Sequence, residues 1–151
     1  MLASEQLGLA EWCLAATVAY VKERRQFARP VGSFQAVKHR LADLWLEIGG
    51  ARAAARNAAG ALAAGALAAG DPGPAVPVAV AVAVAVAQAH CADVAVHAAE
   101  ECVQLHGGIG MTWEHPAHLY LKRAKADQIA FGAPGEHRAA LADLVDVPAP
   151  V

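Results

Sequence analysis

The stretch Val78-Ala79-Val80-Ala81-Val82-Ala83-Val84-Ala85-Val86 decides the fold, because its strict alternation of valine and alanine allows two interpretations. A period of two residues is the pattern of a β-strand. Here both alternating residues are apolar, so no polar face indicates a half-exposed strand. Residues 88–104 then continue with helical composition and no intervening turn signal. The sequence therefore predicts one long buried helix over residues 78–104.

Two further long helices are predicted upstream of this segment. Apolar residues recur at helical spacing over residues 4–25. Pro30 then breaks the pattern, since proline lacks a backbone donor and disfavours a helical conformation in the residue before it. Ser33 is the predicted N-cap of a second helix, which continues past Gly49-Gly50. The Pro/Gly cluster at 70–74 predicts a turn that ends it.

Shorter elements are predicted downstream. Pro116 favours the first turn of a helix that runs through Lys125, and residues 136–144 are typical of a last helix. Residues 147–151 are expected to form a loose tail. The fold class predicted from these elements is all-α, an antiparallel four-helix-type bundle formed by a single domain at residues 1–146.

Composition sets limits on partners and location. The chain has 151 residues, 57% of them hydrophobic, and a net charge of −2, so electrostatics predict neither a nucleic-acid nor a membrane partner. The N-terminus carries no secretion signal, and the apolar run at 75–87 is too short for a secure membrane span. Cys13, Cys91 and Cys102 are an odd number without C-x-x-C spacing and indicate buried thiols. A cytoplasmic location is therefore expected.

The end of the predicted long helix carries the most informative functional motif, Glu101-Cys102-Val103-Gln104-Leu105-His106-Gly107-Gly108-Ile109-Gly110. Glycine ends a helix readily, and its missing Cβ lets backbone N–H groups approach a ligand closely. A glutamine followed by two adjacent glycines at a helix end therefore suits a flat polar ligand. A glycine pair alone is weak evidence, and the other motifs of the chain must support it.

Two earlier motifs supply this support. The chain resembles the C-terminal domain of the FAD-dependent acyl-CoA dehydrogenase family in three motifs that occur in this order: Arg24-Arg25-Gln26-Phe27, Phe34-Gln35, and Gln104 to Gly108. The resemblance implies that Arg24 and Gln35 hold the FAD of a neighbouring subunit. It also implies that the segment from Gln104 to Gly108 holds the adenosine end. The cofactor-binding residues expected from it are Arg24, Phe27, Gln35, Gln104, Leu105, His106, Gly107 and Gly108.

Two features complicate this interpretation. Arg24 taken alone also fits a cation at a helix C-terminus, where the helix dipole favours positive charge. Ala28 stands where the family usually has glycine, which affects the conformation of the loop.

The resemblance also implies a reaction in which a carboxylate takes the α-proton of an acyl-CoA while the flavin accepts a hydride. In the commoner branch of the family the base is a glutamate, and Phe131 occupies the matching position here. Ala133 stands where the family has a threonine that contacts the flavin. A second branch places its glutamate before the position of Met1. No catalytic residue is therefore expected on this chain.

Metal and nucleophile chemistry find little support in the sequence. His97, Glu100 and Glu101 do not reproduce the paired Glu-x-x-His motifs of a di-iron bundle. Pro116 disrupts the helical spacing that a zinc site at 114–118 would need, so a structural turn is expected there. The sequence also contains no nucleophile elbow and no phosphate-binding loop.

The leading hypothesis from the sequence is a flavin-binding and oligomerisation domain of an acyl-CoA dehydrogenase, which oxidises acyl-CoA to 2-enoyl-CoA. The family's further helical and β-domains are not represented in residues 1–151. A homo- or hetero-oligomer, a dimer or a tetramer, is expected to bring the flavin contacts together. The alternative is a noncatalytic helical assembly subunit, supported by Ala28, Phe131 and Ala133. The segment 113–123 resembles family members that act on bulky substrates such as steroid side chains.

Overall fold

A computed structural model describes residues 2–68 and 76–146 of the chain. The predicted turn at 70–74 and the predicted tail at 147–151 lie outside these residues. The structure contains α1 (Leu2–Glu23), β1 (Arg25–Gln26), β2 (Arg29–Pro30), the 3₁₀ helix η1 (Val31–Ser33), α2 (Gln35–Ala68), α3 (Val78–His106), the 3₁₀ helix η2 (Gly107–Met111), α4 (Ala117–Ile129) and α5 (Pro134–Leu144). The all-α prediction is confirmed, with one small two-stranded hairpin as the exception in the described part of the chain.

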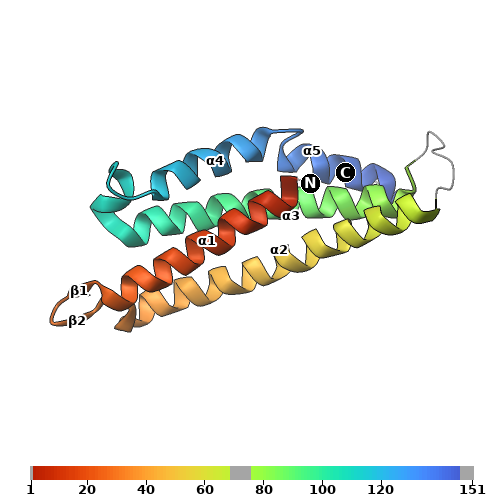
Figure 1. Cartoon of the computed structure of the whole chain (residues 1–151). Helices are drawn as coiled ribbons and strands as arrows, with labels where there is room; N and C mark the ends of the chain where they lie inside the picture. Colours follow the sequence, from red (N-terminus) through yellow and green to blue (C-terminus); the bar gives the residue numbers. More distant parts are fainter. Residues whose placement is uncertain (1, 69–75, 147–151) are drawn as a thin grey trace, which may run out of the picture.

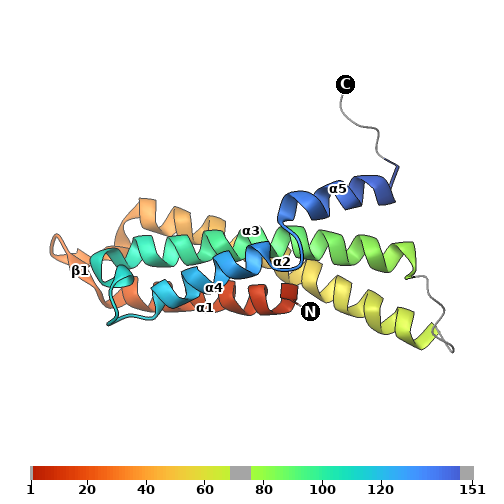
Figure 2. The ribbon, with the colours of Figure 1, turned by 90° about the horizontal axis from the view of Figure 1, so that it is seen from above.

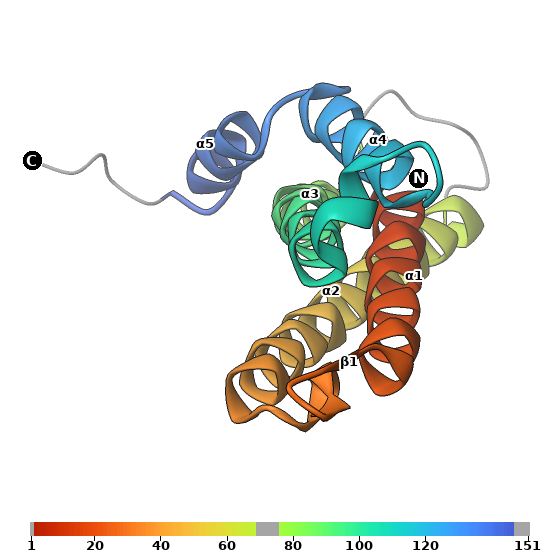
Figure 3. The same ribbon diagram turned by 90° about the vertical axis from the view of Figure 1, so that its left-hand side faces the viewer.

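Helix α3 forms the centre of the molecule and packs against each of the other four α-helices (Figure 1). Helices α2, α3 and α4 each run opposite to the helix before them, and α5 continues in the direction of α4 (Figure 2). Seen along the bundle, α1, α2 and α4 surround α3 on three sides and α5 lies beside it on the fourth (Figure 3). The prediction of a helix rather than a strand over residues 78–86 is confirmed.

The core consists mainly of small side chains, which allow the helices to approach closely. Alanines of all three long helices are buried in it together with Leu44, Ile48, Cys13, Cys91 and Cys102. The segment Val78–Met111 is long and apolar enough to cross a membrane, with a hydropathy of 1.8, but 56% of that window is buried inside the bundle. Burial among the other helices accounts for its apolar composition.

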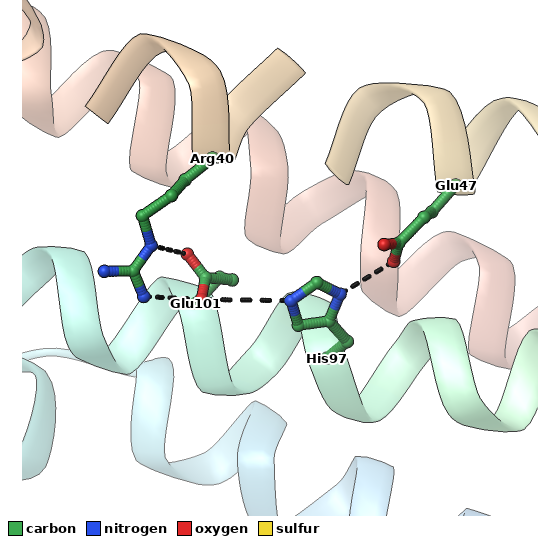
Figure 4. Close-up of polar contacts among 4 residues, drawn as sticks. All are labelled: Arg40, Glu47, His97 and Glu101. Atoms are coloured by element: carbon green, nitrogen blue, oxygen red, sulfur yellow. Dashed lines mark hydrogen bonds and ion pairs between the residues drawn. The ribbon is translucent and has the colours of Figure 1, made fainter. Parts of the chain in front are cut away.

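A network of charged side chains on the surface ties α2 to α3 (Figure 4). Arg40 of α2 donates from Nε and Nη2 to both carboxylate oxygens of Glu101 on α3, at 2.7 and 2.6 Å. The Nδ1 atom of His97 lies 2.7 Å from Glu47 of α2, and its Nε2 atom lies 3.8 Å from Glu101. Of the residues considered for a metal site, His97 and Glu101 are thus engaged with side chains of α2, and Glu100 pairs with Lys125 at 2.9 Å.

Two local predictions near the start of α2 are corrected by the structure. Ser33 is not the N-cap, because its hydroxyl donates to the Pro30 carbonyl at 2.7 Å. The extended residue before α2 is Phe34, whose carbonyl accepts the first N–H groups of the helix. The break after α1 is also more regular than predicted, because it folds into the hairpin of β1 and β2.

Candidate functional site

The hairpin and the glycine pair, two of the predicted ligand-binding motifs, lie at the same end of the bundle (Figures 1 and 2). Helix α1 ends there at the hairpin, α2 begins there, and α3 ends there at Gly107. Tyr20 of α1 links the two regions, because its hydroxyl donates to the backbone carbonyl of His106 at 3.3 Å. The fold therefore gathers motifs that are about 80 residues apart in the chain.

The hairpin turns sharply at Phe27 and Ala28, which both have positive φ angles, 52° and 62°. A two-residue turn of this kind matches the right-handed twist of the strands it joins. The turn presents Phe27 to solvent with 86% of its surface exposed. Its ring makes an edge-to-face contact with Phe34, with ring centroids 6.1 Å apart. The structure thus brings together the phenylalanines of the two N-terminal motifs.

Three arginines make the hairpin strongly positive. Arg24, Arg25 and Arg29 are exposed, and none of them forms an ion pair with a carboxylate in the described part of the chain. The Arg29 guanidinium lies 3.8 Å from the centre of the Phe34 ring, which orients it by a cation–π contact. Gln35 begins α2 close by, and its amide nitrogen lies 3.4 Å from Nε2 of His39. These groups can hold a phosphate or pyrophosphate.

The glycines at the end of α3 differ in why they are glycine. Gly107 has a φ of 65°, a conformation that strains any L side chain. A Cβ on Gly110 would lie 2.7 Å from the Val103 carbonyl oxygen, so close packing within the chain requires glycine there. A Cβ on Gly108 would meet nothing within 4 Å, and its backbone does not need glycine. The absence of a side chain at Gly108 therefore leaves an open surface that a ligand can approach.

The other residues of this motif occupy different depths. Gln104 is exposed, and its carbonyl accepts the N–H of Gly107. Leu105 is half-buried, whereas His106 is buried with 3% of its surface exposed. The His106 ring therefore points into the bundle, and only its backbone can face a ligand at the glycine pair.

A stack of three rings surrounds His106 and includes two residues that were not predicted for the site from the sequence. The His106 ring lies 4.3 Å from the Tyr20 ring and 4.1 Å from the His115 ring, centroid to centroid. Tyr20 stands one helical turn before Arg24, which is a usable sequence signal. His115 lies in the turn before α4, where a structural turn is predicted. Burial lowers the pKa of His115 from its usual value of 6.5, and the neighbouring His106 and His118 lower it further.

Phe131 lies away from this end of the molecule. It follows α4, whose 13 residues separate it from the glycine pair by a helix about 20 Å long. Phe131 has a φ of 59° and 88% of its surface is exposed. The carboxylate of nearby Glu136 accepts the N–H of Ala133 at 2.9 Å and so caps α5. The structure therefore separates the predicted base position from the ligand-binding motifs of the same chain.

The three cysteines are free and buried in the core, as predicted. Burial raises the pKa of the Cys91 thiol to about 11, which keeps it protonated and unreactive. The pKa of Cys13 is also raised, by its contact with Cys102 and by burial. The thiols contribute to packing.

A groove of about 720 Å³ runs between α1 and α2 and is lined by residues such as Leu14, Trp45 and Arg52. Its lining does not include the predicted ligand-binding residues. The candidate site is the exposed end of the bundle that carries the hairpin and the glycine pair.

The comparisons with known proteins agree with this architecture. Residues 1–145 match the model of the family described as acyl-CoA dehydrogenase, C-terminal domain. Acyl-CoA dehydrogenase IpdE2 of Mycobacterium tuberculosis is 45% identical over 136 residues, which cover 90% of this chain and 37% of IpdE2. The chain thus spans about two fifths of the length of this relative.

Solved structures show the same fold. The Tcur3481-Tcur3483 steroid ACAD G363A variant superposes with a TM-score of 0.84 and 33% identity, over 96% of this chain and 37% of that one. The ChsE4-ChsE5 complex of Mycobacterium tuberculosis superposes with a TM-score of 0.82 and 34% identity, over 98% of this chain and 37% of that one. The chain belongs to the acyl-CoA dehydrogenase family and corresponds to its C-terminal domain.

Proposed function

We propose that the hairpin end of the bundle binds FAD as part of an acyl-CoA dehydrogenase. The observation that carries this proposal is the glycine at position 108. Neither its backbone conformation nor its packing within the chain requires a glycine there. The exposed arginines of the hairpin fit the pyrophosphate of the same cofactor. A dinucleotide site needs an open backbone surface for a flat ring and cations for the phosphates, and this end of the bundle offers both.

Different residues of this chain would contact different parts of the FAD. Arg24 and Gln35 would hold the phosphate-bearing part of the FAD, and Phe27 and Phe34 would cover it with apolar surface. Gln104, Leu105, His106, Gly107 and Gly108 would form the surface for the adenosine end. FAD would supply the redox chemistry by accepting a hydride from the β-carbon of the substrate.

In this proposal the substrate is an acyl-CoA thioester and the product a 2-enoyl-CoA. Because Phe131 cannot accept a proton, the carboxylate that removes the α-proton must lie elsewhere in the complete enzyme. The similar Tcur3481-Tcur3483 protein is named a steroid ACAD, which favours a bulky acyl group here as well. We place the enzyme in the cytoplasm, without a nucleic-acid or membrane partner, as a homo- or hetero-oligomer of two or four chains.

The test compares two glycine-to-alanine variants of the purified chain by visible absorbance, after FAD is added and free flavin is removed by gel filtration. Gly108→Ala should lose bound flavin at least tenfold, about 1.4 kcal/mol of binding, because its new methyl group occupies the ligand surface. Its unfolding temperature should not fall, since the methyl group meets nothing in the chain.

Gly49→Ala provides the matched control, because a Cβ at this exposed position of α2 also meets nothing within 4 Å. It should keep the flavin and stabilise α2 by about 1 kcal/mol. Equal flavin retention by Gly108→Ala and the unmodified chain would contradict the proposal.

A noncatalytic assembly subunit is the second candidate. Phe131 favours it, because an exposed aromatic ring at the base position suits contact with another chain better than proton transfer. The ChsE4-ChsE5 complex pairs two differently named chains. The flavin test separates the two candidates only in part, since an assembly subunit can retain a flavin contact. Turnover of acyl-CoA with and without a second subunit would separate them fully.

A further inference from the structure

The ring stack of Tyr20, His106 and His115 connects α1, the end of α3 and the turn before α4. His106 is buried at its centre, and its Nδ1 atom lies 2.7 Å from the backbone carbonyl of Cys102, to which it donates. The Nε2 atom of His106 is buried with no hydrogen-bond partner among the described residues. The centre of the stack is therefore a buried imidazole whose second nitrogen contacts no acceptor in that part of the chain.

His115 is held in its neutral form by its contacts. Its Nδ1 atom accepts the backbone N–H of Ala117, the first residue of α4, at 3.2 Å. This bond satisfies one of the donors that a helix leaves free at its N-terminus. A proton on Nδ1 would break the bond and would place a positive charge at the positive end of the α4 dipole. It would also lie against the His106 ring.

The same stack fixes the backbone of the glycine pair. The Tyr20 hydroxyl holds the His106 carbonyl, directly before Gly107. On the other side of the turn, Gly110 packs so tightly that a Cβ would lie 3.1 Å from Cβ of His106. These two contacts tie the backbone and the Cβ of His106 to the segment from Gly107 to Gly110.

We propose that His106 and His115 are positioning residues for the glycine pair, and that they hold its ligand-binding conformation only while the His115 imidazole is neutral. The proposal rests on the FAD site proposed above and adds a dependence on pH that the site residues alone do not predict.

The titratable groups that face the two histidines come from each element around them. Tyr20 belongs to α1, Cys102 to α3 and His118 to α4, and no carboxylate is hydrogen-bonded to either ring in the described part of the chain. His106 and His118 both lower the pKa of His115, because they disfavour a further positive charge beside them. Cys102 contacts His106, and the pKa of this thiol is lowered to about 6, chiefly by its hydrogen bond with Cys13.

The direction of the pH effect follows from His115, whose pKa in the folded chain lies below the usual 6.5. The fixed conformation is complete above pH 6.5 and is lost as the pH falls through the lower, folded value. Each pKa unit of depression corresponds to a factor of about ten in the equilibrium between the fixed and released turn.

The test measures the hydrogen-exchange protection of the Gly107 amide by NMR between pH 7.5 and pH 5, with the intrinsic exchange rate divided out. This amide donates to the Gln104 carbonyl and reports the turn without any flavin. Protection should fall over this range in the unmodified chain, because the pKa of His115 is lowered in the fixed conformation. His115→Asn retains an acceptor for the Ala117 N–H and cannot be protonated, so its protection should stay constant.

His90→Asn is the matched control, since His90 is exposed on α3 outside the stack, and it should follow the unmodified chain. A Gly107 protection factor that is independent of pH in the unmodified chain, or equally dependent in His115→Asn, would overturn the proposal. Circular dichroism at each pH distinguishes a local release from loss of the whole fold, because a local release leaves the helix signal unchanged.

FAD affinity measured over the same range separates this proposal from the proposed function. If protection falls and affinity falls with it, both stand. If protection falls but FAD does not bind at any pH, the turn is pH-sensitive and the flavin assignment fails. If affinity rises as the pH falls, attraction between the cofactor and protonated histidines dominates and the positioning role is wrong.

Discussion

Ala28 adopts a left-handed backbone conformation with a φ of 62°, next to Phe27 with a φ of 52°. Such conformations cost an L residue about 1–2 kcal/mol relative to glycine. The family resemblance implies glycine at this position, and the structure keeps the turn that glycine would permit. The turn thus keeps its geometry with alanine at position 28, and this alanine is locally strained.

Replacing this alanine tests the strain. Ala28→Gly should raise the free energy of unfolding by about 1 kcal/mol, less the entropy that glycine adds to the unfolded chain. Urea unfolding followed by circular dichroism measures the change. The control is Ala53→Gly at an exposed position inside α2, which should lower the free energy by about 1 kcal/mol. Destabilisation by both variants would show that the turn at Ala28 is not strained.

Single residues also show how far the sequence predicts the site. Gly107 and the hairpin phenylalanines follow from local patterns, because helix ends and aromatic pairs are short-range features. The burial of His106 and its stacking on Tyr20 and His115 depend on how three separate segments pack, which no local pattern encodes. The open space at Gly108 is likewise a property of the folded surface alone.

Among the elements, α2 and α3 are joined by the ion pair of Arg40 and Glu101, whose two short hydrogen bonds form a bidentate contact. The arginine side chain is 45% exposed and the glutamate side chain 12% exposed, so solvent screens part of the attraction. The two helices share no other bidentate arginine contact in the described part of the chain.

A double-mutant cycle with Arg40→Gln and Glu101→Gln should give a coupling energy of about 0.5–1 kcal/mol between these side chains. Thermal or urea unfolding of the four proteins measures it, and 1 M salt should reduce it. A coupling energy of zero would show that this contact does not contribute to the packing of α2 on α3.

Element types can be predicted from this sequence more reliably than their ends. The valine–alanine alternation indicates a helix because it lacks a polar face, and α3 confirms this. The hairpin is not predicted, because Phe27-Ala28 lacks the glycine or asparagine that usually marks a two-residue turn. The N-cap prediction for Ser33 is wrong because its hydroxyl bonds backward to Pro30 and not forward to the helix.

At the scale of the whole molecule, several large apolar side chains are exposed on the described part of the chain. Trp45 and Leu46 on α2 are 61% and 64% exposed, and Trp113, Ile129 and Phe131 are 73–88% exposed along the opposite side of α3. Apolar surface of this extent marks contact regions for other domains or chains. The chain spans only 37% of its relative IpdE2, so the relative contains further sequence.

Light scattering after gel filtration tests this expectation on the purified chain. We expect a dimer or tetramer at micromolar concentration, because association would cover the exposed side chains of α2. Trp45→Glu should shift the distribution toward the monomer. Ala53→Glu tests whether a negative charge at another exposed position of α2 has the same effect on the distribution. A stable monomer of the unmodified chain would contradict this expectation.

The end of the bundle that carries Arg24 and Gly108 is, in our proposal, a flavin surface. Titration of the ¹⁵N-labelled chain with FAD, followed by amide chemical shifts, tests this claim most directly. We expect the largest shifts at Arg24, Gln35 and the segment from Gln104 to Gly108, and no change in the loop at Phe131. Shifts centred on the Phe131 loop, or none at saturating FAD, would contradict it.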